Sequence, residues 1–164
     1  MLDRGRILEK RGRVLLSNLP AHTAERELEV LRKKRQIGRN SLAVESPESA
    51  GPGNAVVVEI VSEHLTEVFT AFGRVRVPAE NVAGEVVREV RRYLDSAAPV
   101  GEHLADRLLV PMALAGGGQF LSGKPSAHAL TNAAVIKAFL PMNIVVEDAG
   151  EGQFRFQLET SQGT

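Results

Sequence analysis

The sequence predicts an α+β protein with a small βαβ-rich domain followed by a second segment of helices and strands. Short runs rich in valine and isoleucine are typical of strands. They alternate with longer stretches whose apolar residues are spaced three and four apart, which is typical of amphipathic helices. A third observation is the proline-containing stretch at residues 96–99, which indicates a boundary. We therefore predict domains over residues 1–98 and 99–164.

The first domain opens with a strand, a helix and a second strand. Residues 6–17 alternate loosely between apolar and polar side chains, and Pro20 ends this predicted strand. The helix is predicted over residues 21–35, because four apolar residues recur there at helical spacing: Ala21, Ala24, Leu28 and Leu31. Residues 42–44 form a short strand candidate. Residues 46–54 are rich in proline, glycine and serine and predict a loop.

Two more strands and the longest helix complete the first domain. Residues 55–61 are rich in valine and isoleucine and predict a buried strand, and residues 66–72 follow at hairpin distance with His64 in the turn. Pro78 opens the helix, because its fixed backbone torsion suits the first helical position and its missing N–H costs nothing there. One stripe of this helix is apolar and is predicted to lie in the core: Val82, Val86, Val87, Val90, Tyr93 and Leu94.

The second segment begins with a predicted helix over residues 102–114. Spacings of three and four residues place His103, Asp106 and Arg107 on one face, with Leu104, Leu108 and Met112 facing inward. Pro111 cannot donate to the carbonyl of Arg107, which leaves an acceptor near these polar side chains. Taken alone, such a cluster is more often a polar helix face than a ligand site.

A histidine, His128, stands at the entrance of a strongly apolar helix. Residues 129–140 are apolar except for Thr131, Asn132 and Lys137, so we expect this helix to be packed on most sides. A helix N-terminus disfavours a positive charge, which suits the neutral imidazole that attacks electrophiles. A single histidine beside a buried helix is nevertheless more often structural. Around this helix, the pattern predicts strands at three places: residues 119–121, 143–147 and 153–158.

Composition limits the class of protein. Twenty basic and twenty acidic residues cancel, so the chain lacks the net positive charge typical of nucleic-acid binders. RNA contacts would have to come from local clusters, such as residues 32–35 or Arg88, Arg91 and Arg92, and both clusters are equally typical of solvated helix ends. Because the chain has no cysteine, no apolar run of membrane-spanning length and no signal-peptide core, we predict a cytoplasmic protein with no membrane contact.

The sequence around His128 resembles the C-terminal half of bacterial RNA 3'-terminal phosphate cyclases. Their signature is a histidine in a Ser-x-His-x-Leu-Thr-Asn setting, followed by an apolar helix and Phe-Leu-Pro, and it is matched here by residues 126–132 and 139–141. Three more blocks agree in order and spacing: Arg11-Gly12 with residues 24–27, residues 51–54, and residues 100–106 running into 111–116. The likeness extends from about Arg4 to about Leu158.

The resemblance implies both a fold and a chemistry. It makes residues 1–98 an insert domain, and residues 99–164 the last part of a catalytic domain built from repeated units of two helices on a four-stranded sheet. A further N-terminal half would be missing from this chain. His128 would carry AMP from ATP, with a divalent metal, Mg²⁺, at the phosphates, and the substrate would be RNA with a 3'-terminal phosphate. The adenylate-binding segment would consist of five residues: His103, Leu104, Ala105, Asp106 and Arg107.

Two residues depart from the family pattern, and several alternatives stay open. Position 103 is often tyrosine in relatives, and Arg107 stands where glutamine is usual, so nucleotide affinity is where we expect a difference. The alternatives to an enzyme are a non-catalytic cyclase-like protein of ribosome assembly and a fragment that binds or dimerises without turnover. The sequence decides neither the metal ligands nor whether the chain forms a homo-oligomer.

Overall fold

The computed structural model describes residues 1–33, 37 and 41–161, and it confirms the α+β class. It divides into two compact units. The N-terminal unit is Arg6–Asp95, and the C-terminal unit joins Met1–Gly5 to Ser96–Thr164. The chain passes from the N-terminal to the C-terminal unit after Asp95. The assignment of domains to residues 1–98 and 99–164 stays a prediction.

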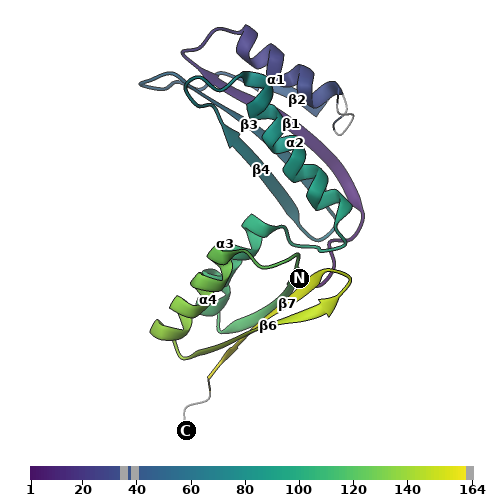
Figure 1. Ribbon diagram of the computed structural model, residues 1–164, viewed down its shortest axis with the longest axis vertical. Coiled ribbons are helices and arrows are strands. Elements are labelled where there is room, and N and C mark those ends of the chain that lie inside the picture. The colour runs from purple at the N-terminus through teal and green to yellow at the C-terminus, as the bar shows by residue number, and fades with distance from the viewer. Residues whose placement is uncertain (34–36, 38–40, 162–164) are drawn as a thin grey trace. The chain divides into compact units, whose positions relative to one another are not determined.

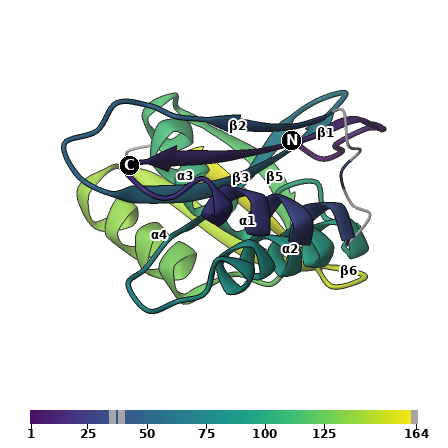
Figure 2. The ribbon, with the colours of Figure 1, turned by 90° about the horizontal axis from the view of Figure 1, so that it is seen from above.

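The N-terminal unit is a four-stranded sheet with two helices on one face (Figures 1 and 2). The strand order is β2-β1-β3-β4, with β1 and β2 parallel and the other neighbours antiparallel. These elements confirm the predicted pattern, although residues 34–36 of the expected first helix lie outside the described residues. The bounds are β1 Ile7–Ser17, α1 His22–Lys33, β2 Leu42–Glu45, β3 Gly53–Ser62, β4 Thr66–Phe72 and α2 Ala79–Asp95.

The core of this unit lies between the sheet and its two helices. Most of the predicted stripe of α2 is buried there, with Leu94 partly buried against it. Gly12 of β1 lies beneath this layer, because a Cβ built on it would come within 2.7 Å of Leu42 Cδ2 and 2.9 Å of Ile37 Cδ1. Glycine therefore lets these side chains pack directly on the strand. The centre of the core is formed by Val14, Leu31, Val56, Val58, Ile60, Val82 and Val86.

A buried carboxyl group lies between α1 and the sheet. Glu27 has no exposed surface, and its Oε1 accepts a hydrogen bond of 2.5 Å from Asn54 Nδ2 at the start of β3. In the described structure its Oε2 is buried without a hydrogen-bond partner. Desolvation by burial raises the pKa of Glu27 to about 7, against the opposing effects of the Asn54 hydrogen bond and the nearby Arg26. Folding therefore makes this carboxyl harder to ionise than a carboxyl in water.

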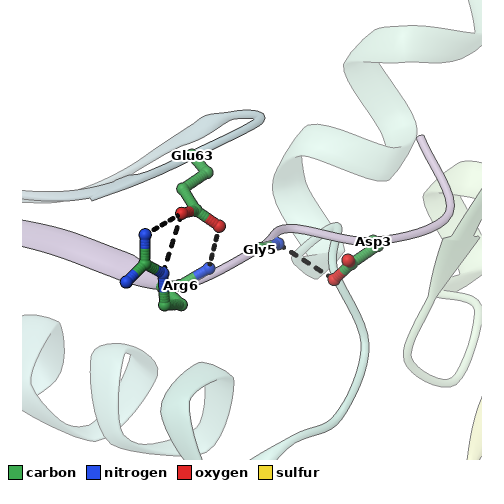
Figure 3. Close-up of polar contacts among 4 residues, drawn as sticks. All are labelled: Asp3, Gly5, Arg6 and Glu63. Atoms are coloured by element: carbon green, nitrogen blue, oxygen red, sulfur yellow. Dashed lines mark hydrogen bonds and ion pairs between the residues drawn. The ribbon is translucent and has the colours of Figure 1, made fainter.

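The chain enters the N-terminal unit at Arg6, where a local cluster of polar contacts holds the end of β1 (Figure 3). The backbone N–H of Arg6 donates to Glu63 Oε2 at 2.9 Å, and its Nε donates to Glu63 Oε1 at 2.8 Å. The backbone N–H of Glu63 in turn donates to the Arg6 carbonyl. The Arg6 side chain is exposed, so the ion pair adds little stability, and its effect is to fix the β1–β3 end.

The C-terminal unit is an antiparallel sheet in the order β5-β7-β6, with α3 packed on β5 and β7 and α4 on β6 (Figure 1). Phe120 and Phe156 stack in its core with ring centroids 4.6 Å apart. The resemblance implies a four-stranded sheet, and the described residues of this unit form three strands, with one isolated parallel bridge from Val100 to Ser122 of β5. The bounds are α3 Glu102–Leu114, β5 Gly117–Ser122, α4 Ala127–Phe139, β6 Met142–Gly150 and β7 Gln153–Thr160.

The buried side of α3 differs from the predicted one. The fully buried residues are Ala105, Leu109 and Ala113, whereas the leucines at 104 and 108 and Met112 are only half-buried. The predicted inward face was therefore wrong by about one residue. The two small alanines allow α3 to approach its neighbours closely, and the larger side chains lie at the flanks of that contact.

The expectation that α4 is packed on most sides is wrong within the described residues. Only Ala129, Ala133 and Ile136 of this helix are buried. Apolar side chains remain exposed on the other sides, and Phe139 keeps 83% of its surface exposed. Although α4 is strongly apolar, no helix in the described residues is both long and apolar enough to cross a membrane.

Candidate functional site

The first turn of α4 carries the predicted nucleophile, His128. Ser126 caps this helix: its Oγ accepts a hydrogen bond of 3.1 Å from the backbone N–H of Ala129. The helix begins at Ala127, so His128 lies just inside it rather than before it. Its side chain is exposed, whereas Ala129 beside it is buried. The cap thus fixes the backbone of an accessible imidazole at the positive end of the helix.

The five residues of the predicted adenylate-binding segment lie in the first turns of α3. His103 and Arg107 are exposed, Leu104 and Asp106 are half-buried, and Ala105 is buried. A ligand can therefore reach the polar side chains, while Ala105 serves to pack the helix. Pro111 lies inside α3, as predicted, and provides no N–H for the Arg107 carbonyl.

One hydrogen-bonded contact joins the two predicted parts of the site. Asn132 Nδ2 of α4 donates to Asp106 Oδ1 at 3.0 Å and lies 3.5 Å from the Asp106 carbonyl oxygen. Asn132 was part of the signature motif, but the sequence analysis gave it no role. Its position four residues after His128, on the same face of the helix, was a signal that it belongs to the site.

The first turns of α3 and α4 lie at the same end of the C-terminal unit. Strands β5 and β6 are both antiparallel to β7, so they run in the same direction, and Val100 pairs with β5 in parallel. Helix α3 connects Val100 to β5, and α4 connects β5 to β6. Each helix therefore links two segments that run in the same direction. The two helices therefore run the same way. Because Asp106 near the start of α3 contacts Asn132 near the start of α4, the turns that carry His103 and His128 adjoin.

A glycine-lysine spacing between the two helices does not form a phosphate loop. Residues 118–124 have the spacing Gly-x-x-x-x-Gly-Lys, but the stretch up to Ser122 is the strand β5. A phosphate loop needs backbone N–H groups free in a loop and a serine or threonine after the lysine, and here Pro125 follows Lys124. The nucleotide site we consider is therefore the one at α3 and α4.

The described side chains do not form a group that fits a resident metal ion. In the ranges that the structure describes, no three or more histidine, aspartate or glutamate residues come together as a metal-binding group. Asp106 has one oxygen already engaged by Asn132. A magnesium ion would need most of its ligands from elsewhere, because it prefers six oxygen ligands in an octahedron.

The basic clusters of the N-terminal unit are partly neutralised. Lys33 lies 3.3 Å from Glu29, and Arg91 lies 3.6 Å from Asp95, both as pairs four residues apart on a helix. Lys34 and Arg35, the rest of the first cluster, lie outside the described residues. These contacts favour the interpretation of both clusters as solvated helix ends.

Comparison with protein families identifies the N-terminal unit. The family model described as "RNA 3'-terminal phosphate cyclase (RTC), insert domain" matches residues 2–95, which is more than half of the chain and includes the whole of Arg6–Asp95. The chain therefore belongs to the RNA 3'-terminal phosphate cyclase family.

Proposed function

We propose that this chain acts in the ATP-dependent conversion of an RNA 3'-phosphate into a 2',3'-cyclic phosphate. The observation that carries the proposal is an exposed histidine, His128, in the capped first turn of α4, within a chain of the cyclase family. Asp106 approaches the same helix through Asn132. A nucleophile, a carboxylate and two helix N-termini at one end of a unit suit the transfer of a phosphate-bound group.

In the first step, a ring nitrogen of neutral His128 attacks the α-phosphorus of ATP. A nitrogen–phosphorus bond forms, the bond to the bridging oxygen breaks, and pyrophosphate leaves. The histidyl-AMP that results is a reactive carrier, which divides one difficult displacement into easier ones. The exposure of the imidazole supports this role, because a large nucleotide must reach it.

Two further displacements complete the reaction. An oxygen of the RNA 3'-phosphate attacks the phosphorus of histidyl-AMP, which frees His128 and leaves AMP joined to the RNA end through a diphosphate. The neighbouring 2'-hydroxyl then attacks the RNA phosphorus and AMP leaves, giving the cyclic phosphate. This last step is favoured by proximity, because both reacting groups belong to one ribose.

The residues of α3 would hold the nucleotide. We assign His103 to stacking on or hydrogen bonding with the adenine. We assign Asp106 to orienting the nucleophile or to giving a single ligand to a metal ion held mainly by the substrate. Arg107 would add positive charge near the phosphates. All three are accessible at least in part. Because Arg107 replaces the usual glutamine, nucleotide affinity is where this chain should differ from its relatives.

Magnesium would act through the phosphates of the substrate. The described side chains provide no cluster of metal ligands that would hold the ion without the nucleotide. An ion that arrives on the phosphates of ATP would neutralise their charge, which is how Mg²⁺ commonly enters such sites.

The reaction should need the N-terminal half that the resemblance implies, so this chain alone should be weakly active or inactive. Five large apolar side chains on α3 and α4 are exposed, which supports a further packing partner for this unit: Val110, Leu114, Leu130, Val135 and Phe139. A second copy of the chain is the other occupant that an experiment must distinguish. We also propose a cytoplasmic location.

The second candidate function is a non-catalytic cyclase-like protein that binds RNA in ribosome assembly. The family match by itself is compatible with it, because the match covers the insert domain and not the catalytic residues. The presence of His128 in an accessible first turn favours the enzyme, since a non-catalytic relative does not need a nucleophile there.

The proposal is tested by a cyclisation assay on a short RNA with a 3'-phosphate, ATP and magnesium. The chain is assayed alone and with the N-terminal half of a cyclase of the same family. We expect cyclic phosphate at an appreciable rate only with that half present, and none with His128→Ala. The control His64→Ala changes a histidine in the β3–β4 turn and should keep full activity. A full rate without the N-terminal half would contradict the fragment part of the proposal, and cyclisation by His128→Ala would contradict the mechanism.

A further inference from the structure

The geometry points to Asn132 as a positioning residue that fixes the carboxylate of Asp106 between the first turns of α3 and α4. This inference rests on the proposed function, because it assigns Asn132 a role in the same reaction. In the sequence, Asn132 is one member of the signature motif. The structure adds its hydrogen bond to Asp106.

The contact restrains Asp106 at two atoms. The Asn132 amide donates to the side-chain oxygen Oδ1 at 3.0 Å and lies near the main-chain oxygen of the same residue, 3.5 Å away. An amide that engages both atoms restricts the rotation of the aspartate side chain about χ1. Asn132 engages Oδ1 and leaves Oδ2 of the same carboxylate outside this contact. A half-buried position strengthens the bond relative to one in water.

Packing alone does not explain an asparagine at this point. The six buried residues of α3 and α4 are all apolar, and four of them are alanines, including Ala105, Ala129 and Ala133. A pair of apolar side chains would suit such a helix contact at least as well, because a polar pair stabilises only if it is fully hydrogen bonded. The Asn132–Asp106 pair is therefore better explained by the position that it gives the Asp106 carboxylate than by packing between the two helices.

The same contact connects the nucleotide segment to the nucleophile. Asn132 follows His128 by four residues on α4, so the two side chains share one face. Asp106 follows His103 by three residues on α3 and shares its face in the same way. By bonding to Asp106, Asn132 fixes how α4 lies along α3 and hence where His128 lies relative to the residues proposed to hold ATP.

The test compares three variants of the full chain, supplied with the N-terminal half and labelled ATP. Asn132→Ala should lower the rate of label transfer to His128 by roughly 10- to 100-fold, by analogy with the loss seen when the hydrogen-bond partner of a metal ligand is removed. The matched control Asn143→Ala, on an exposed position of β6, should transfer label like the wild type. The swap Asp106→Asn with Asn132→Asp keeps the bond between the helices but moves the carboxylate to α4.

The swap shows whether the carboxylate must lie on α3: it should regain the thermal stability that Asn132→Ala loses but not the label transfer. The rotamer of Asp106 then separates positioning by Asn132 from a purely structural role. Full transfer by Asn132→Ala, or full rescue of transfer by the swap, would overturn the inference.

A second readout does not depend on activity. Scalar couplings across χ1 of Asp106, measured by NMR on the chain alone, should report one rotamer in the wild type and averaging in Asn132→Ala. Averaging in the wild type would overturn the inference. If no label is transferred in any variant, the proposed function fails, and the couplings still decide whether Asn132 fixes Asp106.

Discussion

The helices of the two units differ in how much of their apolar surface is buried. In the N-terminal unit, the apolar stripes of α1 and α2 are buried on the sheet, and the outward faces of these two helices are polar. The exposed apolar side chains of this unit, such as Leu8, Phe72 and Val75, lie outside its helices. Arg26 forms a two-bonded pair with Glu80, each bond 2.6 Å long, which joins the two helices. In the C-terminal unit, α3 and α4 bury four alanines, Leu109 and Ile136, and they leave other large apolar side chains exposed.

Whether an apolar helix face is buried depends on the elements that pack against it, and these differ between the two units. The helix α2 has one apolar stripe, and the unit covers that stripe by itself. The helix α4 is apolar on nearly all sides, which is typical of a helix with neighbours all round. The helices of the N-terminal unit thus bury their apolar stripes within that unit, whereas α3 and α4 leave much of their apolar surface uncovered.

The largest effect should follow from a cavity in the core of the N-terminal unit. Leu31 of α1 has 1% of its surface exposed, so Leu31→Ala should lower the free energy of unfolding of this unit by about 2–5 kcal/mol. The matched variant Leu114→Ala removes the same atoms from a side chain that is 72% exposed on α3, and should change stability by less than about 0.5 kcal/mol. Denaturant unfolding followed by circular dichroism measures both. Equal effects would remove the contrast between the units.

The next effect is a pH dependence of the N-terminal unit caused by Glu27. Its pKa is raised from 4.5 to about 7 by folding, so its favourable contribution is complete below about pH 4.5 and is lost as the pH rises through about 7. The wild type should lose roughly 2–3 kcal/mol of stability from this group between pH 4.5 and pH 8.5.

The variant Glu27→Gln cannot ionise. Its loss of stability between pH 4.5 and pH 8.5, measured by unfolding curves at the two pH values, should therefore be smaller than that of the wild type by roughly 2–3 kcal/mol. The charged neighbours to be considered are Arg26 and Glu80, which also interact with this carboxyl. The same pH dependence in the variant and the wild type would show that Glu27 is not its source.

A smaller effect should follow from Gly12. A methyl group there would approach Leu42 and Ile37 within 3 Å, so Gly12→Ala should destabilise the N-terminal unit by about 1–3 kcal/mol. A suitable control is Gly51→Ala, because nothing lies within 4 Å of a Cβ at that loop position. Thermal unfolding of both variants measures the difference. Equal melting temperatures for the two variants would show that Leu42 and Ile37 can move away from β1 at little cost in stability.

The smallest effect on the chain alone should come from Phe139 of α4. Because 83% of this residue is exposed, Phe139→Ser should change the stability of the isolated chain by less than about 0.5 kcal/mol. The same variant should weaken association with the N-terminal half of a cyclase, measured by calorimetry. If instead Phe139→Ser abolishes self-association and leaves binding of that half unchanged, the exposed surface is an interface between copies of this chain.

Most of the fold could be predicted because its signals are local. The helix α3 was predicted with its observed bounds, Glu102–Leu114, and the valine-rich strand and the stripe of α2 follow from the spacing of apolar residues. The buried side of α3 could not be predicted in the same way. Its alanines and leucines are both apolar, and which of them is buried depends on how closely the neighbouring elements approach.

The candidate site was predicted only as residues, not as an arrangement. His128 and the segment from His103 to Arg107 came from motifs, and nothing in the sequence joined them. The link between the two is the hydrogen bond from Asn132 to Asp106, which depends on the parallel course of α3 and α4 in the folded unit. The buried Glu27 was missed for a related reason: acidic residues of a surface helix look alike in sequence, and burial of one of them is a tertiary effect.

The central claim is that His128 becomes covalently linked to AMP. Its most direct test is incubation of the chain with ATP labelled at the α-phosphate, magnesium and the N-terminal half of a cyclase, followed by a denaturing gel. We predict an acid-labile label on the wild-type chain and on Asn143→Ala, and no label on His128→Ala. Label that remains on His128→Ala, or a wild-type chain that stays unlabelled with the N-terminal half present, would contradict the claim.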